Sequence, residues 1–178
     1  IYRKKITFVS ILAGISTKWY KEKISKDIKI VRAMPNLAAS VLKGVTGVYY
    51  SNNILEKEIQ VIKLIIQSIG KIVLLKKEDL IDVVTSISGS GPAYFFYLTE
   101  VLSKIGQKFG LNENDSKTLA FQTFVGSAKL LEETKQNASQ LRKDVTSPGG
   151  TTEAALSVLM QENEGLNKIM DKAIKKAV

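Results

Sequence analysis

The first part of the chain alternates short apolar runs with amphipathic stretches, a pattern typical of alternating β-strands and helices. Strands are predicted over four ranges: residues 5–12, 27–32, 45–50 and 71–75. A short helix from Ser16 to Ile24 separates the first two strands. Between the last two, residues 53–69 carry Leu and Ile at helical spacing and end at Gly70, the expected helix cap. These elements predict β-α-β units and resemble the second half of a mononucleotide-binding sheet.

From Lys77 onward the pattern is helical, with no further convincing strand. Helices are predicted over six ranges: residues 78–87, 92–109, 112–134, 138–145, 152–162 and 166–177. The segment Ser88-Gly89-Ser90-Gly91 is expected to break the first of them, and Pro92 to restart the chain as a helix. Asn112 or Asn114 can cap the helix that follows. The expected fold class is therefore an α/β fragment over residues 1–76 followed by an all-α domain over residues 77–178.

Composition narrows the chemistry that this chain can perform. It has 178 residues and a formal net charge of +9, and it contains no His and no Cys. Cys/His zinc sites, thiol nucleophiles, disulfides and imidazole acid–base catalysis are therefore excluded, and no metal site is expected. Any chemistry must use hydroxyls, carboxylates, lysines, backbone amides or a borrowed cofactor.

The positive charge does not favour a nucleic-acid partner. Of the 26 basic residues only Arg3, Arg32 and Arg142 are arginine, the residue best suited to phosphate and base recognition. The lysines are spread along the chain and often stand beside Glu or Asp, which is typical of solvated helix faces.

The start of the chain has a charge pattern that also occurs in signal peptides. Arg3-Lys4-Lys5 precedes an apolar run from Ile6 to Ile15. Thr7 and Ser10 interrupt this run, which is far shorter than the ~20 residues that span a bilayer. A buried strand explains these residues better, and no membrane partner is expected.

Three short motifs are candidates for binding, and each also has a purely structural interpretation. Met34-Pro35-Asn36 follows a strand, where open α/β sheets bind ligands, but an ordinary turn is the simpler interpretation. Gly89-Ser90-Gly91 is either a tight connection between helices or the approach to a helix N-terminus at Pro92 that binds an anion. It is not a complete Gly-x-Gly-x-x-Gly motif, because Tyr94 stands where the third glycine would fall.

The third motif, residues 147–153, has the sequence Ser-Pro-Gly-Gly-Thr-Thr-Glu. Its adjacent glycines let the backbone lie close to a ligand, and a helix that begins at Thr151 or Thr152 supplies unpaired amides and the positive end of a dipole. A simple helix cap is the alternative, because Thr is a good capping residue.

Taken together, three ordered segments closely resemble the signatures of pyrroline-5-carboxylate reductase. They are Arg32-Ala33-Met34-Pro35-Asn36, residues 85–94 (Thr-Ser-Ile-Ser-Gly-Ser-Gly-Pro-Ala-Tyr) and residues 145–152 (Val-Thr-Ser-Pro-Gly-Gly-Thr-Thr). The resemblance covers essentially residues 29–178. Residues 1–28 are consistent with a late strand of the family's nucleotide-binding domain.

The resemblance implies an enzyme that reduces 1-pyrroline-5-carboxylate to L-proline with NADPH or NADH, the last step of proline biosynthesis, in the cytoplasm. It also implies a Rossmann-like domain and a helical domain that interleaves with that of a second copy. The cofactor would contact six residues: Leu12, Ala13, Gly14, Met34, Pro35 and Asn36. The substrate would contact five: Ser147, Gly149, Gly150, Thr151 and Thr152. Thr152 matches the position proposed to hydrogen-bond the ring nitrogen, so it is the candidate catalytic residue.

A dimer, or a multiple of dimers, is also expected from the apolar positions after Lys77, which exceed what one small domain needs. They include Phe95, Phe96, Leu98, Leu102, Leu119, Phe121, Phe124 and Leu130. The run Phe95-Phe96-Tyr97 is interpreted as core or as an interface between helices.

The sequence departs from the family pattern at two places. The glycine fingerprint that grips the cofactor's pyrophosphate is absent from the 178 residues, and Asp144 stands where some members carry an amide. Two interpretations therefore remain open: an enzyme, of which this is a fragment or one half of a split polypeptide, and a non-catalytic remnant that keeps only the helical dimerisation domain.

Overall fold

The computed structural model describes residues 6–178, so Arg3-Lys4-Lys5 and the first residue of the strand expected over 5–12 lie outside it. The chain divides into two compact units. One comprises the chain up to Ala93 together with Ala177–Val178, and the other comprises Tyr94–Lys176. The domain boundary predicted near Lys76 stays a prediction. Within the described residues, no helix combines the length and apolar character needed to cross a bilayer.

The first unit is built on a four-stranded sheet in the order β1-β2-β3-β4. The strands are β1 (Thr7–Ser10), β2 (Lys29–Met34), β3 (Gly44–Tyr50) and β4 (Gly70–Leu74). Helix α1 (Thr17–Lys23) connects β1 to β2, and α2 (Glu56–Gln67) connects β3 to β4. Both connected pairs run parallel, as the predicted β-α-β units require. The fold class expected from the sequence is confirmed: a small α/β sheet precedes a mostly helical region.

The sheet is mixed because β2 and β3 pair antiparallel, with Ala33 opposite Val48. Only residues 35–43 connect them, including a short 3-10 helix, η1 (Leu37–Val41). A parallel pair needs a crossover of about a dozen residues or more, so this connection is too short for one. β2 also extends two residues further than the predicted 27–32, and Met34 is its last residue rather than part of the loop.

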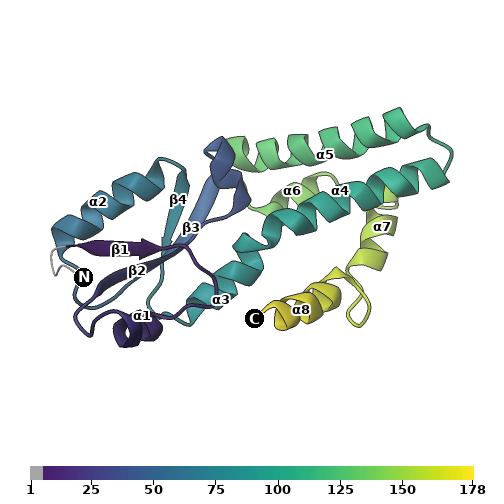
Figure 1. Cartoon of the computed structure of the whole chain (residues 1–178). Helices are drawn as coiled ribbons and strands as arrows, with labels where there is room; N and C mark the ends of the chain where they lie inside the picture. Colours follow the sequence, from purple (N-terminus) through teal and green to yellow (C-terminus); the bar gives the residue numbers. More distant parts are fainter. Residues whose placement is uncertain (1–5) are drawn as a thin grey trace. The chain divides into compact units, whose positions relative to one another are not determined.

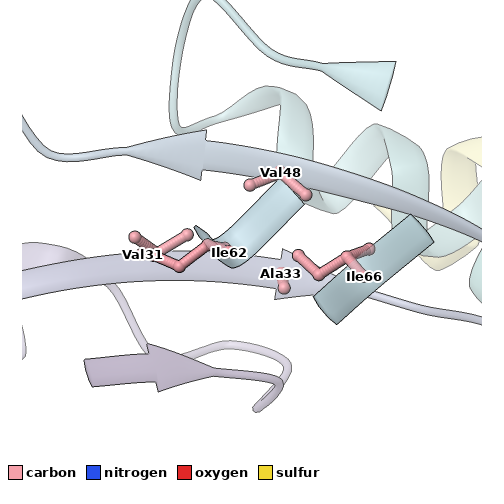
Figure 2. Close-up of a cluster of buried hydrophobic side chains, with 5 residues drawn as sticks. All are labelled: Val31, Ala33, Val48, Ile62 and Ile66. Atoms are coloured by element: carbon pink, nitrogen blue, oxygen red, sulfur yellow. The ribbon is translucent and has the colours of Figure 1, made fainter. Parts of the chain in front are cut away.

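One face of this sheet carries the core of the first unit. Figure 2 shows Ile62 and Ile66 of α2 against the side chains of β2 and β3. The cluster consists of Val31, Ala33, Val48, Ile62 and Ile66, each at most 6% exposed. Alternate residues of β2 point to the opposite face, where α1 and α3 (Leu80–Val84) lie (Figure 1).

Gly70 is not the helix cap that the sequence predicted. The cap of α2 is Ser68, and Gly70 begins β4 with φ of 148°. A Cβ at this position would lie 1.9 Å from the Gly44 carbonyl oxygen. Glycine is therefore required here for backbone approach between β3 and β4.

The segment expected to break the helix after Ile87 is instead a π-helical turn, η2 (Thr85–Gly89), between α3 and α4 (Gly91–Lys108). The Ser90 amide donates to the Thr85 carbonyl at 2.8 Å, which is the wide i to i−5 bond of such a turn. π-turns are common at functional sites, and this one carries the Ser-Gly-Ser-Gly motif.

The second unit is helical. In it α4 continues from Tyr94 and is followed by α5 (Glu113–Thr134), α6 (Ala138–Asp144), α7 (Thr151–Leu159) and α8 (Leu166–Ala177). Asn112 caps α5, since its Oδ1 accepts from the Asp115 amide at 2.9 Å. Helices α4 and α5 form an antiparallel hairpin (Figure 1), in which the Phe95 and Phe124 rings lie 5.5 Å apart.

Candidate functional site

The first unit brings the two predicted cofactor segments to the same edge of the sheet. Because β1 and β2 are parallel, with Ser10 opposite Arg32, the loops that leave their carboxyl ends emerge together. Leu12, Ala13 and Gly14 follow β1, and Met34-Pro35-Asn36 ends β2 and continues beyond it. This edge is where open α/β sheets bind nucleotides.

The loop after β1 is open to a ligand. Leu12, Ala13 and Gly14 are all exposed. Gly14 has φ of 72°, and no heavy atom lies within 4 Å of the position that a Cβ would take. The backbone can therefore approach a flat or charged group closely, as a cofactor-binding turn needs.

Asn36 links two of the motifs. Its Nδ2 donates to Ser88 Oγ at 3.3 Å, and its Oδ1 accepts from the Val45 amide at 3.3 Å. Met34 is buried, and a Cβ on Gly89 would lie 3.8 Å from its sulfur. Asn36 thus holds the loop after β2 against η2, and any cofactor contact that it makes uses its remaining bonding capacity or its backbone.

The approach to Pro92 offers few free amides. Ser90 donates to Thr85, Ala93 donates to the Ser90 carbonyl at 3.0 Å, and proline has no N–H. This geometry favours the tight connection between helices over anion binding at this motif.

In the second unit, the loop between α6 and α7 has its glycine amides already engaged. Gly149, at φ of 70°, donates to Glu153 Oε2 at 2.7 Å, and Gly150 donates to the Ser147 carbonyl at 3.0 Å. Gly150, not a threonine, is the N-cap residue of α7. The interpretation of Thr151 or Thr152 as a helix cap is therefore wrong.

The free groups of this loop lie at the start of α7. The amides of Thr151 and Thr152 stand in the first turn, where no preceding turn supplies an acceptor. Among residues 6–178, none accepts a hydrogen bond from the hydroxyls of Thr151, Thr152 or Ser147. Two amides, three hydroxyls and a helix dipole suit a small anion with a polar group beside it.

A cavity of about 280 Å³ lies beside this loop, between α6 and α7. Its lining includes Arg142, Lys143 and Glu153. The sequence did not single out the two cations, although Arg142 is one of only three arginines. Asp144 is exposed, and its Oδ1 accepts from Gln140 Nε2 at 2.7 Å, an interaction within α6.

Comparison with known proteins gives the same family for most of the chain. The family model described as pyrroline-5-carboxylate reductase dimerisation matches residues 78–178. Pyrroline-5-carboxylate reductase 2 of Bacillus subtilis (strain 168) is 36% identical over 158 residues, which are 89% of this chain and 56% of that protein. The chain therefore spans little more than half the length of this relative.

Solved structures agree. The Coxiella burnetii pyrroline-5-carboxylate reductase matches with a TM-score of 0.87 at 36% identity, over 95% of this chain and 62% of that one. The Plasmodium falciparum pyrroline carboxylate reductase, solved with NADP bound, matches with a TM-score of 0.84 at 31% identity, over 96% of this chain and 68% of that one. The chain belongs to the pyrroline-5-carboxylate reductase family.

Proposed function

We propose that this chain is the later part of an enzyme that reduces 1-pyrroline-5-carboxylate to L-proline with NADPH or NADH. When bound, the cofactor supplies a hydride to the imine carbon, and the ring nitrogen takes a proton, so NAD(P)H leaves as NAD(P)⁺. The protein must then orient two molecules, hold a carboxylate and allow one proton to arrive. The lack of His and Cys is no obstacle to this reaction.

The observation that best supports the proposal is the arrangement of the N-terminal turn of α7. The Thr151 and Thr152 amides are available for the substrate carboxylate because they stand in the first turn of the helix. The amides of Gly149 and Gly150, in contrast, already donate to Glu153 and Ser147. The Thr152 hydroxyl is free to hydrogen-bond the ring nitrogen. An unassisted threonine is a weak acid, so Thr152 mainly orients the ring while water delivers the proton.

The cofactor residues of this proposal are Leu12, Ala13, Gly14, Met34, Pro35 and Asn36. Their support is the shared edge of β1 and β2, the open backbone at Gly14 and the family membership. A cytoplasmic location is part of the same proposal, because the reaction draws on the cell's reduced nicotinamide pool.

We further propose a homodimer, or a multiple of dimers, formed through the helical unit. Large apolar side chains of α4 and α5 are exposed on the single chain, among them Phe96, Phe121 and Leu130 at 53–59%. The Phe95-Phe96-Tyr97 run is exposed as well, so it does not form the core of one chain. An isologous interface would cover this surface.

The test joins this chain to the part of the Bacillus subtilis relative that the match leaves uncovered and measures NADPH oxidation that depends on 1-pyrroline-5-carboxylate. Thr152→Ala should lower kcat and leave binding of a proline analogue nearly unchanged, since the amides remain. The matched control is Thr134→Ala, whose hydroxyl bonds to the Leu130 carbonyl of its own helix. An inactive parent fusion that still dimerises would favour the non-catalytic remnant instead.

Gly150→Val tests the anion site in the same fusion. A Cβ at Gly150 would lie 3.0 Å from the Ser147 carbonyl oxygen, so the branched side chain displaces the loop that leads to the free amides. Binding of the analogue should be lost while helix content is kept. If Gly150→Val binds the analogue as tightly as the parent, the loop is only a helix start and the anion binds elsewhere.

A further inference from the structure

Three hydrogen bonds converge on the carboxylate of Glu78. Oε1 accepts from the Thr17 amide at 2.6 Å and from Arg32 Nη1 at 3.2 Å, and Oε2 accepts from Thr17 Oγ1 at 2.5 Å. Thr17 and Arg32 are 7% and 5% exposed. Glu78 lies 61 residues from Thr17 and 46 from Arg32 along the chain, so these bonds tie together three distant segments of the first unit.

The two partners of Glu78 adjoin the two predicted cofactor segments. Thr17 begins α1, three residues after Gly14, and Arg32 stands in β2, two residues before Met34. One carboxylate therefore fixes the end of the loop after β1 relative to the end of β2. The distance between these segments decides whether one cofactor can contact both.

The buried charge of Arg32 makes the loss of this link costly. Its Nη2 is buried and has no hydrogen-bond partner among the described residues, and Glu78 supplies the ion pair at Nη1. A buried guanidinium needs a countercharge, because a charge without a partner is strongly disfavoured away from water. Moving Glu78 away would thus force Arg32, and the strand end that carries it, to rearrange.

A second ion pair of the same unit provides the comparison. Lys29 Nζ contacts Glu58 Oε1 at 2.7 Å, and both side chains are largely buried, at 16% and 18% exposed. This pair joins the start of β2 to the first turn of α2, at the opposite end of β2 from Met34. It stabilises the same unit without contacting either cofactor segment.

We propose that Glu78 is a positioning residue of the cofactor site, which holds the loop after β1 and the end of β2 at a fixed separation through Thr17 and Arg32. The identity of the cofactor rests on the proposed function, whereas the link between the two segments rests on the contacts of Glu78 alone.

Hydrogen exchange in the 178-residue chain tests the link directly. Glu78→Gln removes the charge at nearly constant volume, and exchange should rise about tenfold or more in peptides covering residues 11–17 and 33–36, since charge-assisted bonds are lost. Glu58→Gln, the matched control, should leave exchange in both peptides within about twofold of the parent. Thr17→Val keeps the ion pair and should raise exchange in residues 11–17 alone.

Two outcomes of this experiment would overturn the proposal. One is unchanged exchange in both peptides of Glu78→Gln. The other is a uniform rise over the whole first unit that Glu58→Gln reproduces, because Glu78 would then be an ordinary stabilising residue. Thr17→Val keeps the test decisive if Glu78→Gln fails to fold, since a rise confined to residues 11–17 supports the link and no rise contradicts it.

A kinetic measurement in the fusion protein separates positioning from stability. Glu78→Gln should raise the KM for NADPH about tenfold and change kcat by less than about threefold, because the cofactor must first order the two segments. Equal losses in Glu78→Gln and Glu58→Gln would contradict the positioning role. An inactive parent fusion would refute the proposed function, while the exchange experiment would still decide the role of Glu78.

Discussion

Replacing one exposed leucine of α5 should weaken the proposed dimer far more than it lowers the stability of the single chain. Leu119 is 55% exposed, so somewhat more than half of its side chain remains to be covered by a partner. Full burial of a leucine contributes about 1.5–3 kcal/mol, and the exposed part therefore about 1–1.5 kcal/mol. In a two-fold interface the substitution occurs twice, which gives about 2–3 kcal/mol for Leu119→Ser.

This free energy corresponds to a rise of about 30- to 150-fold in the dimer dissociation constant. Sedimentation equilibrium or light scattering over a concentration series measures it. The control is Leu64→Ser, the same chemical change on α2 of the first unit, where Leu64 is 69% exposed. The control should leave the dissociation constant within about threefold of the parent.

Two results would refute this reasoning. A parent chain that stays monomeric at micromolar concentration would show that the exposed apolar surface of α4 and α5 does not self-associate. Equal weakening by Leu64→Ser and Leu119→Ser would show that association is non-specific rather than confined to the helical unit.

Three further outcomes are expected. The 178-residue chain alone should show no NAD(P)H-dependent reduction in a spectrophotometric assay, because it contains no Gly-x-Gly-x-x-Gly turn for the pyrophosphate; robust turnover by purified chain would contradict this. The hydrogen bond from Lys29, with that from the Leu55 amide, lowers the pKa of Glu58, so its contribution to stability is complete above the pKa of the unfolded chain and is lost as pH falls through the folded pKa. Urea midpoints at pH 6 and pH 3 should therefore differ less in Glu58→Gln than in the parent, and an equal difference would argue against the ion pair. Gly70→Ala should lower the unfolding free energy by about 2–4 kcal/mol in urea titrations, since its Cβ would collide with the Gly44 carbonyl, and a neutral effect would mean that β3 and β4 can separate locally.

The elements that the sequence predicted well are those whose signals are local. Asn112 was one of two candidate caps, and the structure shows its side chain at the Asp115 amide. The leucine and isoleucine spacing of residues 53–69 predicted α2, whose Ile62 and Ile66 are indeed buried. A cap or an amphipathic face depends on neighbours within about one or two helical turns, so a single sequence contains the information needed to find it.

The sequence did not predict the role of a residue where that role is set by a partner far away along the chain. Gly70 directly follows the amphipathic stretch of residues 53–69, where a helix cap is expected. Its role is nevertheless set by the Gly44 backbone on the adjacent strand. Hydrophobic periodicity does not specify the direction of β3 relative to β2, and the two strands pair antiparallel because residues 35–43 are too few for a crossover. Glu78 carried no recognisable signal at all, since its partners lie 61 and 46 residues away.

The loop between α6 and α7 shows that partners only three or four residues away can also change a functional hypothesis. The family resemblance places Gly149 and Gly150, as well as Thr151 and Thr152, at the substrate. The structure shows that the Glu153 carboxylate occupies one and the Ser147 carbonyl the other. The same bonds hold Gly149 in its left-handed conformation and present the first turn of α7 as a preformed group of donors. A substrate carboxylate that binds Thr151 and Thr152 would therefore not have to displace the negatively charged Glu153. In the proposed site the glycines therefore shape the loop, and the amides of Thr151 and Thr152 are the donors proposed for the carboxylate.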